Sequence, residues 1–246
     1  MKYLMTFFGL CCLPFLAQAG PQINVGVVYD YLDGEKSTYL KRVFNGGDAT
    51  AFVKVNVLEI VYDAEGVPQE IPVKSQADVV ARDGLMASPA RLIVPANGMQ
   101  GTRLLFMGER EHERYFRVRF IPVVPEQEDQ FAVSSEERED YKKELSAGVN
   151  ILAGYGTIFF VRPKVTRFDT KIENTKSQYL LRNNGNSVVI VDQFKDCSSK
   201  SEQECNPVTK HHILAGREFK FDKQAGREYR FKLVEGEKKK TIEVKG

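Results

Sequence analysis

The side chains that most often carry catalysis or bind metal ions are scarce in this sequence. The three histidines are His112, in the charged run EREHER, and the adjacent pair His211 and His212. Neighbouring residues on a strand point to opposite faces, so this pair is poorly placed to hold one metal ion. The carboxylates gather between positions 126 and 140, where a solvated surface explains them. The chain has no nucleophile elbow, zinc-hydrolase motif or phosphate loop, and we therefore expect no catalytic residue, no metal and no cofactor.

The N-terminus has the order of parts found in a secretory signal peptide. Lys2 supplies a positive charge, an apolar core follows from Leu4 to Leu16, and Ala17-Gln18-Ala19 is a small-x-small cleavage site. A buried N-terminal helix is the alternative interpretation. We expect residues 1–19 to be removed and the rest to be exported. No later stretch is long and apolar enough to be transmembrane.

Export leaves two cysteines, Cys197 and Cys205, in the stretch DCSSKSEQEC, because Cys11 and Cys12 depart with the signal peptide. The loop between the remaining pair is polar and lacks the C-x-x-C spacing of metal sites. An oxidising compartment favours a disulfide, which would stabilise the fold by roughly 2.5 kcal/mol in the chain-entropy model. A redox pair is the alternative.

Composition narrows the class of protein further. The chain has 246 residues, 42% of them hydrophobic and 28% charged, which is typical of a globular protein with two domains of ordinary size. The formal net charge of +2 gives no reason to expect nucleic acid or an anionic membrane surface as a partner. Any basic function must depend on where individual cations lie.

One stretch, Leu145 to Pro163, stands out as a candidate interaction element. Its first half alternates, and the apolar row consists of Leu145, Ala147, Val149, Ile151 and Ala153. A period of two places such a row on one face of a strand. The second half, TIFFV, indicates a strand buried on both faces, and Pro163 ends it. The stretch therefore predicts one long strand whose early half offers an apolar row that something must cover.

The other elements that would position this stretch are short strands separated by Gly and Asn turns. This spacing is typical of β-sandwiches. We expect an all-β fold of two sandwich domains, residues 20–163 and 164–246. Between residues 125 and 143 we expect a solvated mobile loop, with a short helix over 134–143 as the alternative. The expected strands are 20–32, 37–44, 51–62, 71–73, 91–94, 102–107, 114–124, 165–170, 179–182, 188–195, 212–214, 217–221, 228–234 and 240–245.

Several motifs, taken together and in this order, resemble a known family. They are LKRVFNGG, RLIVPANGMQGTRLLF, ERYFRVRFIPV, GTIFFVRPK, LRNNGN and the cysteine pair followed by HHILAGREFKF. The set is similar to the periplasmic chaperones of chaperone–usher pili, of the alternative type that serves common-pilus and colonisation-factor fimbriae. The resemblance implies two immunoglobulin-like β-sandwich domains in a boomerang-like arrangement, a periplasmic location, and pilus subunits and an outer-membrane usher as partners. It implies no ATP or other cofactor.

The resemblance also implies what covers the apolar row. A pilus subunit is a sandwich that lacks its last strand, and the chaperone lends it one by donor-strand complementation. Leu145, Ala147, Val149, Ile151 and Ala153 would then fill the groove of the subunit, and the loop before them would extend the donor strand. An exposed edge of this kind also favours self-capping of the free protein as a homodimer.

In one respect the sequence departs from the family. The better-known chaperones bind the C-terminal carboxylate of the subunit with an Arg on the first strand and a Lys late in the donor strand, and the matching positions here are Tyr29 and Ile158. Among nearby cations we favour Arg117, because its strand should start beside the end of the donor strand. The remaining candidates are Lys41, Arg42, Arg103 and Arg119, with solvated surface positions as the alternative. We expect Arg162 to be a structural ion-pair member between the domains.

Three other functions are open to a chain of this composition. The first is a pilus subunit or adhesin built of the same sandwiches, although residues 20–32 look like an ordinary first strand rather than a donor extension. The second is a carbohydrate- or peptide-binding module, with ten tyrosines but no tryptophan. The third is a zinc hydrolase that uses His112 or the pair His211 and His212.

Overall fold

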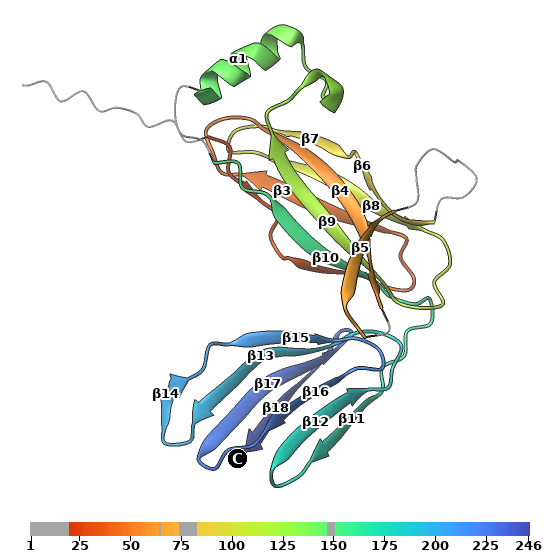
Figure 1. The fold of residues 1–246 in the computed structure, drawn as a ribbon, viewed down its shortest axis with the longest axis vertical. Coiled ribbons are helices and arrows are strands. Elements are labelled where there is room, and N and C mark those ends of the chain that lie inside the picture. Colours follow the sequence, from red (N-terminus) through yellow and green to blue (C-terminus); the bar gives the residue numbers. More distant parts are fainter. Residues whose placement is uncertain (1–19, 64, 74–82, 147–150) are drawn as a thin grey trace, which may run out of the picture.

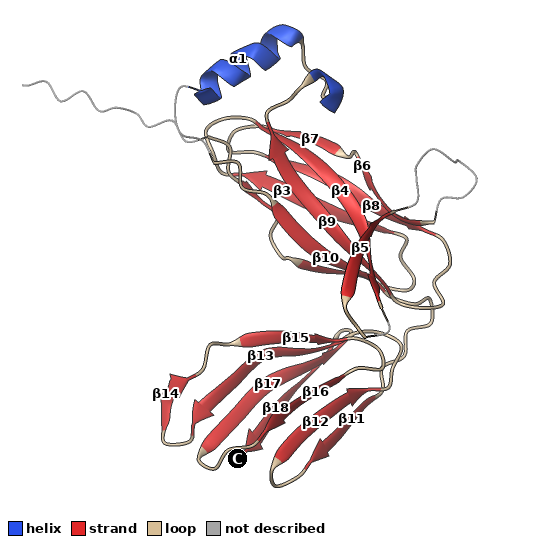
Figure 2. Ribbon diagram, in the orientation of Figure 1, coloured by secondary structure: helices blue, strands red, loops and turns tan. Residues whose placement is uncertain are grey.

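The computed structural model describes residues 20–63, 65–73, 83–146 and 151–246, which form two lobes of two β-sheets each (Figure 1). Strands make up most of both lobes, and the described helices lie at one end of the first lobe (Figure 2). The expectation of an all-β fold is therefore confirmed. The predicted signal peptide, residues 1–19, lies outside the described residues.

In the first lobe a four-stranded sheet faces a six-stranded sheet. The order of the four-stranded sheet is β1-β3-β8-β6, with the bounds Ile23–Asn24, Thr38–Asn45, Met99–Met107 and Gly84–Ser88. The order of the six-stranded sheet is β2-β10-β9-β4-β5, with β7 also paired to β4; the bounds are Tyr29–Leu32, Tyr155–Val161, Arg114–Val123, Ala51–Tyr62, Pro68–Pro72 and, for β7, Arg91–Val94. Among the described strands, β2 and β10 form the one parallel pair.

The second lobe is a smaller sandwich. Its three-stranded sheet has the order β11-β12-β16, with the bounds Thr170–Asn174, Gln178–Asn183 and Glu218–Asp222. The five-stranded sheet has the order β14-β13-β17-β18, with β15 paired to β13; the bounds are Ser201–Cys205, Val189–Ser198, Arg227–Glu235, Lys238–Lys245 and, for β15, Thr209–Ile213. Cys197 and Cys205 face each other across β13 and β14 and form the predicted disulfide, which is confirmed.

Alternation along the strands builds the core of the first lobe. In β4, Val53 and Val55 are buried. In β9, Phe116, Val118 and Phe120 are fully buried, while the residues between them face outward. Replacing one such phenylalanine by alanine typically costs about 3–5 kcal/mol. The core therefore fixes which side chains of β9 lie on the outer face of the six-stranded sheet.

Some strand predictions need correction, because the partner strands lie far away in the sequence. The sequence predicts one strand over 20–32, but the chain changes sheets within it: β1 pairs with β3, and β2 pairs with β10. Gly26 lies between these two strands with a φ of 68°, a conformation that glycine adopts without strain. The predicted strands 91–94 and 102–107 both exist, but they are not a hairpin, since β7 pairs with β4 and β8 with β3. The sequence analysis missed β6.

The two lobes meet at the segment that follows β10 and diverge toward the left of the view in Figure 1. Arg162 is buried at this junction, where it forms an ion pair with Asp33 at 2.9 Å. Its guanidinium also lies over the rings of Tyr31 and Phe168. The ion-pair partner thus belongs to the first lobe, rather than to the second as expected. The domain boundaries expected from the sequence stay a prediction, which the grouping of the strands supports.

Candidate functional site

The edge of the six-stranded sheet is only partly covered. β10 pairs along its whole length with β9, from Tyr155 opposite Phe120 to Val161 opposite Arg114. On its other side β10 pairs with β2 only from Ile158 onward. Among the described residues, Tyr155 to Thr157 therefore have a paired strand on one side alone. Unpaired main-chain groups at a sheet edge are a template for a strand from another chain.

The residues just before β10 continue this open edge. Ile151 is 81% exposed, and Ala153 is exposed as well. These residues do not form a strand in the free protein, so the predicted long strand is reduced to Tyr155–Val161. Ala147 and Val149 lie outside the described residues. The late part of the apolar row thus lies uncovered beside an open edge.

Leu145, the first residue of the apolar row, needs a correction. It belongs to α1, Ser135–Ser146, and not to a strand. Its side chain is only 9% exposed and packs in a cluster with Phe52, Phe131 and Tyr141. Helix is favoured because Tyr141 and Leu145 are four residues apart and so share one helical face.

We call α1 and the short 3₁₀ helix η1, Gln127–Asp129, the helical cap, because they cover one end of the first sandwich. Ser134 and Glu137 form a reciprocal capping box at the start of α1: the Ser134 amide donates to the Glu137 carboxylate, and the Glu137 amide donates to the Ser134 hydroxyl. These bonds hold the pKa of Glu137 below its ordinary value. The solvated loop expected over 125–143 is therefore wrong, and the helix considered as the alternative is present.

The outer face of the six-stranded sheet carries the favoured cation. Tyr29, Ile158 and Arg117 are register partners across β2, β10 and β9, so they lie in one row. Arg117 donates to Glu70 of β5 at 2.9 Å, and Arg119 contacts the same carboxylate. These guanidinium groups, that of Arg117 above all, hold the pKa of Glu70 below its ordinary value. Arg117 thus neighbours the two positions at which the family carries its basic pair.

The other candidate cations lie elsewhere. Lys41 is buried and donates to Asp30 at 2.7 Å and to the carbonyl of Val27 at 2.6 Å. Its position in β3 faces the core, where an isolated charge would be costly. The candidate role of Lys41 as a carboxylate anchor therefore does not fit the structure. Arg42 and Arg103 are exposed on the four-stranded sheet, which is the sheet opposite β10.

An aromatic cluster at the junction escaped the sequence analysis. The phenol of Tyr31 and Nε2 of His212 lie 2.7 Å apart, and the ring of Phe160 stacks on both side chains. Burial, with the charge of Lys210 nearby, lowers the pKa of His212 to about 4. Only the pairing of β2 with β10 and the meeting of the lobes bring these rings together. No local sequence pattern could have indicated the cluster.

Glu113 is the buried carboxylate of the same junction. It accepts hydrogen bonds from the Ser187 hydroxyl and from the main-chain amide of Val188 in the second lobe, the latter at 2.9 Å. Burial raises the pKa of Glu113 to about 7, although these hydrogen bonds favour its ionised form. The carboxylate thus links the two lobes through directed hydrogen bonds.

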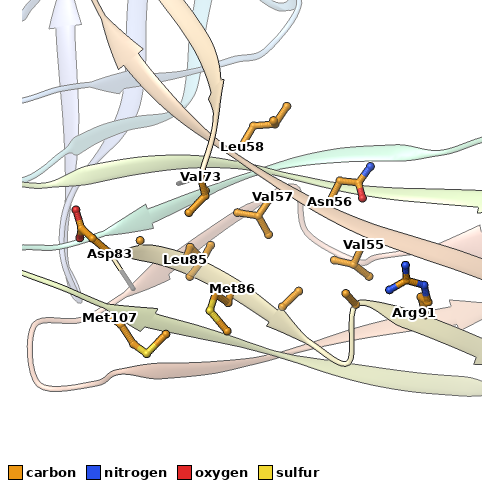
Figure 3. A pocket seen from close by; sticks show the side chains of 13 residues that line it. Val55, Asn56, Val57, Leu58, Val73, Asp83, Leu85, Met86, Arg91 and Met107 are labelled. Atoms are coloured by element: carbon orange, nitrogen blue, oxygen red, sulfur yellow. The ribbon is translucent and has the colours of Figure 1, made fainter. Parts of the chain in front are cut away.

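The largest cavity lies away from the open edge. It measures about 550 Å³ and lies between β4 and β6, with Val55, Val57, Leu85 and Met86 among its lining residues (Figure 3). β9 separates it from β10 within the six-stranded sheet. Within the described residues, no group of three or more His, Cys, Asp or Glu side chains is arranged to hold a metal ion. No described helix is long and apolar enough to cross a membrane.

Comparison with known proteins gives consistent relatives. No family model matches the chain. The chain is 27% identical to a CS1 fimbrial subunit of Escherichia coli over 190 residues, which make up 76% of this chain and 73% of that protein. It is 23% identical to the protein named probable fimbrial chaperone EcpB of Escherichia coli over 223 residues, which make up 88% of this chain and 89% of that protein.

Solved structures share the fold. The class 5 fimbriae chaperone CfaA matches with a TM-score of 0.55 and 18% identity, over 91% of this chain and 98% of that one. A chain of the CsuC–CsuE chaperone–tip adhesion subunit complex of Acinetobacter baumannii matches with a TM-score of 0.53 and 13% identity, over 91% and 98% of the two chains. The chain is thus similar in fold to chaperones of the chaperone–usher pathway and similar in sequence to a fimbrial chaperone. The resemblance inferred from the motifs is confirmed.

Proposed function

We propose that this chain is a periplasmic chaperone that binds, folds and caps pilus subunits by donor-strand complementation and delivers them to an outer-membrane usher. It performs this work as a binding protein rather than as an enzyme. The observation that carries the proposal is the open edge of β10, preceded by the exposed side chains of Ile151 and Ala153. A subunit that lacks a strand offers an apolar groove and unpaired main-chain groups, and this edge supplies the complement to both.

In this proposal the donor residues are Leu145, Ala147, Val149, Ile151 and Ala153. Ile151 contributes most, because it is the largest of the exposed residues and removes the most apolar surface from water when a groove covers it. The alternating small residues allow the partner backbone to approach closely. Leu145 joins the row only if it leaves the helical cap.

We also propose that Arg117 binds the C-terminal carboxylate of the subunit. A strand that continues the line of β2 along β10 runs parallel to β10 and ends where β2 begins, at Tyr29. Its terminal carboxylate would then lie over the row formed by Tyr29, Ile158 and Arg117. The Arg117 guanidinium already holds a carboxylate, that of Glu70, and its planar fork suits a second one. Arg119 is the next candidate, because it shares Glu70.

The main rival is a pilus subunit, which the name of the CS1 relative describes. The fold favours a chaperone, because the likeness to solved fimbrial chaperones extends over both lobes and about nine-tenths of the chain. A subunit that lacked its last strand would also need a complementary strand from another chain. Here the first lobe holds all the strands of both its sheets within one chain.

Co-expression with the fimbrial subunits encoded beside this gene tests the proposal. We expect the tagged chain to co-purify from periplasm with one subunit in a one-to-one complex, and the subunit to be degraded when the chain is absent. The control is the same experiment with a subunit that already carries its own fused donor strand, which should not be captured. A chain that forms polymers with itself and captures no subunit would support the rival instead.

A further inference from the structure

The two ends of the proposed donor row are treated in opposite ways in the free protein. Ile151 is 81% exposed beside the open edge, whereas Leu145 is 9% exposed inside the helical cap. Four residues separate Ser146, the last residue of α1, from Ile151. The largest apolar side chains of the row are therefore a free one and a sequestered one.

The cap that sequesters Leu145 is a well-formed site. The Tyr141 hydroxyl donates to the carbonyl of Thr50 at 2.8 Å. The ring of Phe52 meets the rings of Phe131 and Tyr141 edge to face, with centroids 5.3 and 4.9 Å apart. Ile93, Val123, Val124 and Val133 pack around this cluster.

Polar contacts fasten the other end of the cap. The Lys54 ammonium forms an ion pair with Asp129 of η1, and Arg91 donates to the carbonyl of the same residue. Lys142 of α1 bridges to Glu126 at 3.0 Å. Both helical pieces are thus tied to the first sandwich and to each other.

We propose that Leu145 has two alternative binding sites: the cluster of the helical cap in the free protein and the groove of the subunit in the complex. This inference rests on the proposed function. A helix advances about 1.5 Å per residue and a strand about 3.3 Å, so Leu145 cannot join a donor strand while the last turn of α1 stays intact. The cap therefore competes with the subunit for Leu145. It lowers the apparent affinity in proportion to the fraction of molecules whose cap is closed.

Variants that weaken the cap without changing a donor residue test this competition. Tyr141→Phe removes the hydrogen bond to Thr50, and Phe131→Ala removes one wall of the cluster. Lys143→Ala is the matched control, because Lys143 lies on the exposed face of α1. Two differently tagged chaperones, wild type and variant, are mixed with a limiting amount of the subunit that co-purifies with the wild type. The equilibrium share of subunit on each tag gives the ratio of the affinities.

We expect Tyr141→Phe and Phe131→Ala to bind the subunit about three- to tenfold more tightly than the wild type, and Lys143→Ala to bind equally. An equal share for the two cap variants would mean that Leu145 stays in the cap in the complex. A smaller share would mean that the cap positions the donor stretch. Either result overturns the competition.

A second measurement follows the cap directly. The native chain contains no tryptophan, so fluorotryptophan introduced by Phe131→Trp gives one fluorine signal, and this signal should shift when the subunit is captured if Leu145 leaves. The variant Ile151→Asp separates the two proposals. If it still takes an equal share of subunit, the proposed donor row is wrong, whatever the cap variants do.

Discussion

The two lobes protect their sheet edges differently. In the second lobe, β18 is the last strand of its sheet and carries Lys238, Lys239, Lys240 and Lys245, so charge discourages another strand from pairing there. In the first lobe, the edge of β10 is preceded by the uncharged residues of the sequence ILAGY, from Ile151 to Tyr155. A chain that charges one edge and leaves another apolar has an apolar edge that serves a partner.

The largest expected effect comes from giving the apolar edge the protection of the charged one. Ile151→Asp should reduce subunit capture by more than about 100-fold, because a carboxylate would be buried in an apolar groove. The free protein should unfold at the same denaturant concentration as the wild type, since Ile151 is exposed. Co-purification measures capture, and urea unfolding measures stability.

Lys240→Asp, on the exposed edge of the second lobe, is the matched control and should leave capture unchanged. If Ile151→Asp were itself misfolded, Ile151 would be an ordinary core residue. The contrast between the two edges would then fail.

Arg117→Ala should have the next largest effect. If the guanidinium binds the subunit carboxylate away from water, its loss should weaken capture by about 2–5 kcal/mol. Arg103→Ala removes an exposed cation from the opposite sheet and should have no effect. Equal recovery of subunit from periplasm with Arg117→Ala and with the wild type would remove Arg117 as the anchor.

Removal of the disulfide should affect the second lobe alone. The double substitution Cys197→Ser with Cys205→Ser should lower its stability by roughly 2.5 kcal/mol, because the unfolded chain regains the freedom of the loop. Thermal unfolding followed separately for the two lobes measures this. Capture at low temperature should persist, because the open edge belongs to the first lobe. A large loss of capture at low temperature would mean that the second lobe contributes to the binding edge.

The smallest expected effect concerns pH and the junction between the lobes. The pKa of Glu113 is raised from 4.5 to about 7 in the folded state, so its contribution to stability falls as the pH rises between these values. The pKa of His212 is lowered from 6.5 to about 4, so its contribution rises with pH over that range. The two slopes oppose each other, and the wild type should change little between pH 5 and 6.5.

Glu113→Gln removes one of these slopes. The stability of this variant should therefore rise with pH over the same interval, which urea unfolding at several pH values measures. His212→Phe should show the reverse slope. Parallel pH profiles for the wild type and both variants would mean that neither group titrates as its burial indicates.

Local pattern was sufficient where an element depends on its own residues. The alternation of β4 predicted its bounds, Ala51 and Tyr62, and the spacing of the cysteines predicted the disulfide. It was insufficient where a distant partner decides. Leu145 alternates as a strand residue would, yet Phe52 and Phe131 offer its side chain a cluster that only a helix reaches. The row that brings Arg117 beside Ile158 likewise depends on the register of β9 against β10, which no local signal specifies.

The change of sheet at Gly26 has a consequence for how this class of binding edge can vary. Because the N-terminal segment reaches the six-stranded sheet only after Gly26, it leaves Tyr155 to Thr157 without a strand from that side among the described residues. A crossover two residues earlier would lengthen β2 and occupy that stretch of backbone. The position of one glycine therefore sets the length of the foothold that an incoming chain finds, independently of any side chain that the chain contacts.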